Sequence, residues 1–155
     1  MGELKKVAIV MGSKSDEPKM SACSEMLSYF GIDYETFVLS AHRTPKQTAS
    51  FAESADKKDF KVIIAAAGMA AHLPGVIASH TTLPVIGVPL SGSALGGLDA
   101  LYSMVQMPKG VPVATMALDK AGAVNAAIFA AQIMSLEEPE IADRLRRFKA
   151  QGCKI

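Results

Sequence analysis

The sequence contains no tryptophan, and only 6% of its 155 residues are aromatic. Charged residues make up 20%, somewhat below the roughly 25% of an average soluble domain. The 16 basic and 15 acidic residues nearly cancel, so there is no electrostatic case for binding nucleic acid or an anionic membrane. Because a small protein short of charge often hides surface against copies of itself, we expect a homo-oligomer.

Cysteine and histidine are also scarce. The two cysteines, Cys23 and Cys153, lie far apart, which excludes a disulfide framework and is typical of a reducing cytosol. The histidines are His42, His72 and His80, and none has a second soft ligand at zinc spacing. We therefore expect no metal site.

Long uninterrupted hydrophobic runs are missing as well. The apolar run from Val7 to Met11 is shorter than the roughly 7–15 residues of a signal-peptide core. Residues 62–98 carry no Asp, Glu, Lys or Arg, but glycines and prolines divide them into pieces shorter than the roughly 20 residues that cross a membrane. We therefore expect a cytoplasmic protein without a membrane partner.

Half of the residues are hydrophobic, which excludes a disordered chain, and the length suits one domain. Short apolar runs alternate with amphipathic stretches, a pattern typical of a parallel sheet covered by helices on both faces. The pattern predicts strands at 7–11, 34–39, 61–66, 84–88 and 111–116. It predicts helices at 17–30, 45–57, 74–79, 98–105, 121–134 and 137–151.

Five strand–loop–helix units predict an α/β fold with right-handed crossovers. In such sheets, ligands bind beyond the carboxyl ends of the strands. The segments predicted to lie at these ends are 12–13, 40–43, 68–72, 89–93 and 117–120. We therefore expect the functional side chains to lie in these segments.

The segment Gly12–Asp16 joins a strand to a helix. Its glycine lets backbone approach a ligand, and the free N–H groups at a helix start favour an anion. Ser13 and Ser15 add hydroxyl donors, and Asp16 can accept from sugar hydroxyls. The pattern is neither a Walker loop nor a dinucleotide fingerprint, and the same residues also suit a well-capped helix.

The segment Ser40–Pro45 places a histidine and an arginine at a strand's carboxyl end. Arg43 suits bidentate phosphate binding, and His42 beside it can carry a proton near neutral pH. The alternative is that both side chains only cap and cover the sheet edge.

The segment Ala65–Gly75 is almost without side chains, so its backbone can approach a small planar ligand. His72 within it either donates to a carboxylate or satisfies backbone carbonyls. The residues alone thus indicate a site for a phosphorylated small molecule with one candidate acid/base, His42, and do not reach the reaction.

The sequence resembles the PurE family of purine biosynthesis. The resemblance is carried by the segments 7–16, 40–45, 68–75, 83–89 and 102–108, and it continues in 110–116 and 121–127. The resemblance implies a flavodoxin-like three-layer αβα sandwich with a parallel sheet of five or slightly more strands. It also implies a homo-octamer, in which the single domain 1–155 packs a C-terminal helix, 137–155, on a neighbouring subunit. We expect this helix to need a partner because Ile141, Leu145 and Phe148 share one face.

The family's mutase branch moves the carboxylate of 5-(carboxyamino)imidazole ribonucleotide from the exocyclic nitrogen to ring carbon four. The product is 5-amino-4-imidazolecarboxylate ribonucleotide, and the resemblance implies neither ATP, metal nor organic cofactor. His42 matches the catalytic histidine. The positions that match the substrate pocket are Ser13, Ser15, Asp16, Ser40, Ala41, Arg43, Gly68, Ala70, Ala71, His72 and Leu73.

Two alternatives stay open. A sister branch, aminoimidazole ribonucleotide carboxylase, uses free carbon dioxide on the same fold, although the segment 70–75 resembles the mutase branch more closely. A non-catalytic flavin or nucleotide module is more remote, since Gly12–Asp16 lacks the Thr-rich pattern of flavodoxins and no aromatic is placed to stack a flavin. Ala66 and Met69 stand where many relatives have glycine, which leaves the backbone of 66–69 open.

Overall fold

The structure, a computed structural model, describes residues 6–154 and contains a five-stranded sheet in the order β2-β1-β3-β4-β5. All four neighbouring pairs are parallel. The strands are β1 (Lys6–Met11), β2 (Asp33–Val38), β3 (Phe60–Gly68), β4 (Val85–Leu90) and β5 (Ala114–Thr115). The predicted α/β fold with a five-stranded parallel sheet is therefore confirmed.

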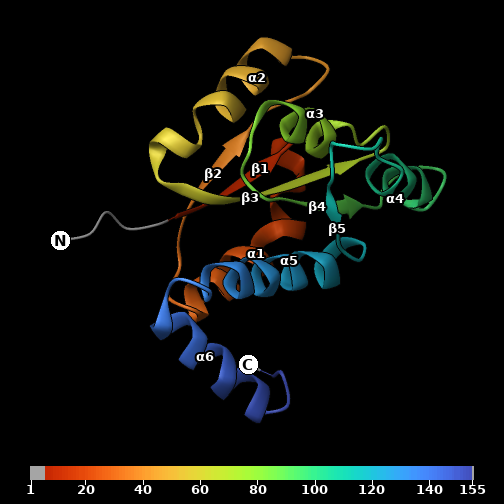
Figure 1. Cartoon of the computed structure of the whole chain (residues 1–155). Helices are drawn as coiled ribbons and strands as arrows, with labels where there is room; N and C mark the ends of the chain where they lie inside the picture. The colour runs from red at the N-terminus through yellow and green to blue at the C-terminus, as the bar shows by residue number, and fades with distance from the viewer. Residues whose placement is uncertain (1–5, 155) are drawn as a thin grey trace.

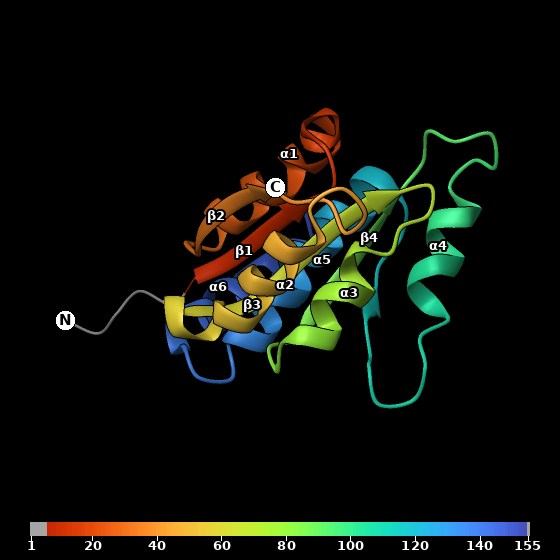
Figure 2. The same cartoon turned by 90° about the horizontal axis from the view of Figure 1, so that it is seen from above.

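Helices cover both faces of this sheet, so the fold has three layers (Figure 1). One layer holds α2, α3 and α4, and the opposite layer holds α1 and α5, with α6 beyond them; Figure 2 shows α2 and α3 lying over the strands. The α-helices are α1 (Glu17–Tyr29), α2 (Pro45–Ser54), α3 (Leu73–His80), α4 (Leu98–Val105), α5 (Asp119–Met134) and α6 (Pro139–Ala150). Two 3₁₀ turns, η1 (Lys14–Asp16) and η2 (Asp56–Lys58), were not expected from the sequence.

The apolar run of β1 supplies both faces of the core. Val7 and Ile9 pack in the cluster on the α1 and α5 side of the sheet, and Ala8 and Val10 pack in the cluster on the α2 and α3 side. Side chains alternate across a strand, so a strand covered on both faces must be apolar throughout. Cys23 on α1 is fully buried, and burial raises the pKa of its thiol to about 12, so this cysteine is a core residue.

Within residues 6–154 no helix is long and apolar enough to cross a membrane. The uncharged segment 62–98 forms most of β3, then α3, β4 and the loop before α4, as its glycines and prolines predicted. At the other edge, β5 is much shorter than the predicted strand 111–116. Pro112 has no N–H to donate, and pairing with β4 is limited to Ala114 and Thr115.

The C-terminal helix α6 buries its apolar face within the same chain. Ile141, Leu145 and Phe148 are at most 8% exposed. The centroid of the Phe148 ring lies 5.5 Å from the centroid of the Phe30 ring. The reason given above for a neighbouring subunit at this helix is therefore wrong. Packing of 137–155 on another subunit stays a prediction, as does the domain range 1–155, of which residues 1–5 and 155 lie outside the described part.

The helix α4 has the opposite character. Its outward face carries Leu98, Tyr102 and Val105, which are each more than half exposed, and Leu95 just before it is 64% exposed. Residues at this spacing lie along one side of a helix. The exposed apolar face of α4 is thus defined by Leu95, Leu98, Tyr102 and Val105.

Candidate active site

The carboxyl ends of β1, β2, β3 and β4 surround one hollow of about 560 Å³. It holds most of the residues that the sequence proposed for a substrate pocket, although they come from four separate segments. The lining residues are Gly12, Ser13, Ser15, Asp16, Lys19, Ser40, Ala41, His42, Arg43, Ala67, Gly68, Met69, Ala70, Leu73, Ser91 and Gly92.

The first wall of the hollow is the segment Gly12–Asp16, which is held by hydrogen bonds of its own. The Ser13 N–H donates to the Asp16 carboxylate at 3.2 Å, and the Ser15 N–H donates to the Ser13 hydroxyl oxygen at 3.3 Å. Asp16 is the N-cap residue of α1, although its side chain makes no capping hydrogen bond there. Ser13 forms a capping box on η1. The N–H groups of Gly12, Ser13, Ser15 and Asp16 all have acceptors within the protein, so the polar groups that this turn presents at the hollow are the hydroxyls of Ser13 and Ser15 and the Asp16 carboxylate.

Asp16 is the partly buried acid of this wall. Burial raises the pKa of its carboxyl above the usual range, against the hydrogen bond from Ser13 and the positive charge of Lys19, which both lower it. Asp16 therefore gains a proton at a higher pH than an exposed aspartate does. Above that pH it is an acceptor suited to hydroxyl groups.

The second wall is the turn Ser40–Thr44 after β2. Ser40 is bonded on three of its atoms: its N–H donates to the Thr44 hydroxyl, its hydroxyl oxygen accepts the Arg43 N–H at 3.1 Å, and its carbonyl accepts the Thr44 hydroxyl. The hydroxyl of fully buried Thr48 also donates toward the Ser40 carbonyl at 3.3 Å. This turn fixes the backbone from which His42 and Arg43 project.

His42 lines the hollow and contacts His72, which is itself not among the lining residues. His42 Nε2 and His72 Nδ1 are 2.8 Å apart, a hydrogen bond in which one ring donates and the other accepts. The two rings are nearly perpendicular, at 83°, and both side chains are exposed. The sequence proposed both histidines for the site, but their direct contact was not foreseen, because the two residues lie on loops of different strands.

The third wall is the almost side-chain-free segment after β3. Ala66 continues β3 between its neighbours, and Met69 adopts a left-handed φ of 56°, a conformation that suits glycine better. This explains the glycine expected at position 69. Ala71 does not line the hollow but lies buried beneath it, and Leu73 begins α3.

Sequence reasoning did not name Lys19, Ser91 or Gly92 as site residues, yet all three line the hollow. Ser91 and Gly92 lie in the predicted ligand-facing segment 89–93, which offered a signal. Lys19 follows Asp16 by three residues and so lies one helical turn further on the same side. Within residues 6–154, no group of three or more His, Cys, Asp and Glu could hold a metal ion.

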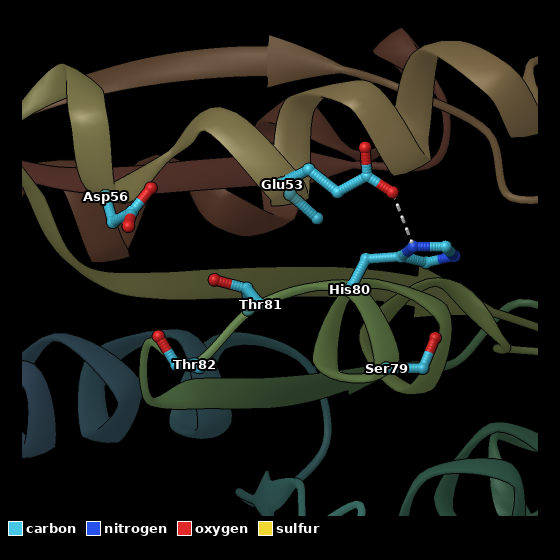
Figure 3. A pocket seen from close by; sticks show the side chains of 7 residues that line it. Glu53, Asp56, Ser79, His80, Thr81 and Thr82 are labelled. Carbon is cyan, nitrogen blue, oxygen red and sulfur yellow. Dashed lines mark hydrogen bonds and ion pairs between the residues drawn. The ribbon is translucent and has the colours of Figure 1, made fainter.

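A second hollow, of about 430 Å³, lies at the other ends of α2 and α3 (Figure 3). His80 Nδ1 approaches the Glu53 carboxylate at 3.1 Å there, and Asp56, Thr81 and Thr82 complete its rim. His80 thus joins two helices, in keeping with a structural role. None of the residues proposed for the substrate pocket lines this second hollow.

Comparisons with known proteins agree on one family. The model of the AIR carboxylase family matches residues 6–154. The chain is 54% identical to the N5-carboxyaminoimidazole ribonucleotide mutase of Vibrio cholerae, over 94% of this chain and 90% of that protein. It is 52% identical to the enzyme of the same name from Escherichia coli, over 97% of this chain and 89% of that protein.

Among solved structures, PurE from Treponema denticola has a similar fold. Its crystal structure superposes with a TM-score of 0.87 at 31% identity, covering 96% of this chain and 92% of that chain. The similarity therefore extends over the whole three-layer domain and over all four segments that surround the hollow.

Proposed function

The chain belongs to the AIR carboxylase, or PurE, family, and we infer that it is a mutase of purine biosynthesis. Its substrate is 5-(carboxyamino)imidazole ribonucleotide, and it is an isomerase because it only moves a carboxylate within one molecule. The identity of more than half to relatives bearing the mutase name carries this inference. The hollow at the carboxyl ends of the strands supplies the place for the chemistry.

The reaction breaks a nitrogen–carbon bond and forms a carbon–carbon bond. Loss of the carboxylate from the exocyclic nitrogen gives carbon dioxide and an electron-rich aminoimidazole, whose nitrogen must gain a proton. Ring carbon four then attacks the carbon dioxide and must lose its proton. One group placed between the two atoms can deliver the first proton and accept the second.

We propose His42 as that group. Its imidazole lines the hollow, and its contact with His72 leaves the Nδ1 atom of His42 able to face a substrate. A histidine whose second nitrogen is hydrogen-bonded is held in one ring orientation and one tautomer. His72 in this arrangement orients His42, while contact of His72 with the substrate carboxylate stays a prediction.

The remaining pocket residues divide by chemistry. Ser13 and Ser15 offer their hydroxyl groups to the phosphate, with Arg43 as the cation that can hold two of its oxygens. Asp16 accepts from the ribose hydroxyls. Ser40 and Ala41 hold the turn that carries His42, and we place the substrate's imidazole ring beside Gly68, Ala70 and Leu73, with Ala71 buried and outside the lining.

The third wall of the hollow, the uncharged segment after β3, suits the reaction. Ala67, Gly68, Met69 and Ala70 present no charge and no acid to the hollow. Carbon dioxide must stay beside the ring until carbon four attacks, and water must be kept away from it. A wall of backbone and small apolar groups meets both needs without binding the gas so tightly that transfer slows.

The test of mutase against carboxylase is to supply each branch's substrate separately. We expect purified protein to convert the carboxyamino substrate without added bicarbonate. Turnover only from aminoimidazole ribonucleotide plus carbon dioxide would place the chain in the sister branch, whose name the family model carries. A yellow protein that turned over neither substrate would favour the flavin module.

We also propose a cytoplasmic homo-octamer, with the exposed apolar face of α4 in a subunit contact. Large exposed apolar patches normally mark interfaces, and this face replaces α6 as the surface that needs a partner. We expect light scattering to report an octamer and Tyr102→Lys to dissociate it. Leu136→Lys is the matched control, because Leu136 is 85% exposed but lies between α5 and α6. A monomeric wild-type protein would contradict the proposal.

A further inference from the structure

Lys19, a lining residue of the hollow, connects three segments of the chain. It lies in the first turn of α1, and its ammonium donates to the Ser91 carbonyl at 2.5 Å, 72 residues away in the sequence. The same ammonium is 3.2 Å from the carboxylate of Asp119, the first residue of α5. One side chain thus connects the helix start after β1, the loop after β4 and the start of α5.

Asp119 is held firmly in this contact. Its carboxylate accepts the Ser91 N–H at 2.9 Å and also the Ser91 hydroxyl. Its backbone adopts a left-handed φ of 53°, which aspartate tolerates better than most residues. Burial favours the neutral carboxyl, but the hydrogen bonds from Ser91 and the ammonium of Lys19 outweigh it and hold the pKa of Asp119 below its usual range.

The hydrogen-bond donors around Asp119 would suit a bound anion, and the Asp119 carboxylate already fills that role. The Ser91 N–H, the Ser91 hydroxyl and the Lys19 ammonium all point at the Asp119 carboxylate. A substrate phosphate is therefore not needed there and is left to the hydroxyl groups of Ser13 and Ser15 and to Arg43. Lys19, Ser91 and Gly92 nevertheless line the substrate hollow, so the contact forms part of its wall.

Lys19 also acts on Asp16, one helical turn before it. Its positive charge opposes the effect of burial on the Asp16 carboxyl. The other titratable or charged groups lining the hollow are His42 and Arg43, from the turn after β2, while Asp119 from α5 reaches Lys19 directly. Among these groups, Lys19 is the cation whose charge lowers the pKa of Asp16.

We propose that Lys19, anchored by Ser91 and Asp119, is a positioning residue that fixes the loop after β4 to the start of α1 and thereby holds Asp16, one helical turn before it, in place at the hollow. The proposal rests on the function inferred above, because it assigns Asp16 to the ribose. Lys19 does not take part in the proton transfers. Its loss should therefore weaken substrate binding and spare turnover.

Kinetics test this division. For Lys19→Met we expect KM to rise by at most about tenfold, because loss of the contacts to Ser91 and Asp119 frees the loop that borders the substrate hollow, while kcat stays within about twofold of wild type. Lys19→Arg should restore most of the affinity, because its guanidinium can still donate to Ser91 and pair with Asp119. Lys61→Met, a lysine at the far end of β3, is the control for net charge and should leave KM unchanged.

A titration of the Asp16 carboxyl by carbon NMR in the substrate-free protein gives a readout independent of activity. We expect Lys19→Met to raise the pKa of Asp16, because the variant loses the positive charge that lowers it. Circular dichroism establishes that each variant is folded.

An unchanged Asp16 titration in folded Lys19→Met would overturn the proposal, as would a loss of kcat at constant KM. Neither result touches the proposed function, which stands or falls with wild-type turnover of the carboxyamino substrate. Conversely, inactive wild-type protein would defeat the proposed function and leave the Asp16 titration as a direct test of Lys19.

Discussion

The two sides of the hollow are built in different ways. The anion side, Gly12–Asp16 with Arg43, takes its shape from hydrogen bonds within short turns, such as Ser13 to Asp16. The histidine side, His42 with His72, exists because loops 30 residues apart in the sequence meet at the sheet edge. In the proposed function, the substrate-binding turns are thus shaped mainly by local hydrogen bonds, whereas the proton-moving pair depends on tertiary structure. Variants on the two sides should separate into KM and kcat effects.

The largest effect is expected on the histidine side. His42→Asn keeps a polar side chain of similar size and removes the titrating group. Because general acid–base catalysis is worth roughly 10²–10⁴ in rate, kcat should fall by about that factor while KM changes little. Steady-state kinetics, with substrate binding measured by calorimetry, provide the check.

Near-normal turnover of His42→Asn with an unchanged pH profile would contradict the assignment of proton transfer to His42. It would show that another group moves the protons, and His72 would be the next candidate. A large rise in KM instead would move His42 to the binding side.

Arg43→Lys should give the largest effect on the anion side. Lysine offers one point charge where the guanidinium fork can hold two phosphate oxygens. Losing one charge-assisted hydrogen bond costs about 1.5–3 kcal/mol, so we expect KM to rise about 10- to 100-fold with a smaller change in kcat. An unchanged KM would remove Arg43 from the phosphate site, and Lys46→Met in the same turn region is the matched control for charge.

The same contrast explains what could be predicted from the sequence. The strands and helices follow from apolar periodicity, and the site segments follow from the rule that ligands bind at the carboxyl ends of parallel strands. The contact between His42 and His72 could not be predicted, because it depends on how two loops fold toward each other. The network of Lys19, Ser91 and Asp119 was missed for the same reason, since each residue alone looks ordinary.

The helices α4 and α6 show a second limit of the same kind. Both have an apolar face, and only the tertiary structure decides which face is covered. The α6 face packs on Tyr29, the last residue of α1, and on Phe30 after it, whereas Tyr102 on α4 is 61% exposed. An amphipathic pattern therefore predicts that a face must be buried, and not by which chain.

A smaller effect on the histidine side comes from His72. His72→Phe keeps a ring against His42 and removes the hydrogen bond between them. Loss of one such bond costs about 0.5–1.5 kcal/mol, so kcat should fall about tenfold at most, with a changed pH profile and constant KM. His72→Asn should restore part of the rate, because its side chain can still bond to His42. If KM rises instead, His72 binds the substrate carboxylate rather than orienting His42.

The smallest effect is the pH dependence of binding, and it belongs to Asp16. Burial raises the pKa of its carboxyl above the usual range, so the neutral form that no longer accepts two hydroxyl hydrogen bonds persists to higher pH than for an exposed aspartate. Affinity is therefore present above the raised pKa and is lost as the pH falls through it. We expect KM to rise in that acid range by a few-fold, about the cost of one hydrogen bond to a charged group.

The substrate phosphate also titrates near pH 6, and Asp16→Asn separates the two contributions. In this variant KM should be raised at every pH, and any acid dependence that remains belongs to the phosphate. Measurement in the reverse direction uses the carbon-bound carboxylate, which avoids the labile one. If wild type and Asp16→Asn shared the same pH dependence of KM, the carboxyl would not contact the ribose, and the anion side would have to be built from Ser13 and Arg43 alone. If instead the acid dependence appeared in kcat, Asp16 would belong with His42, and the division of the hollow into a binding side and a proton-moving side would fail.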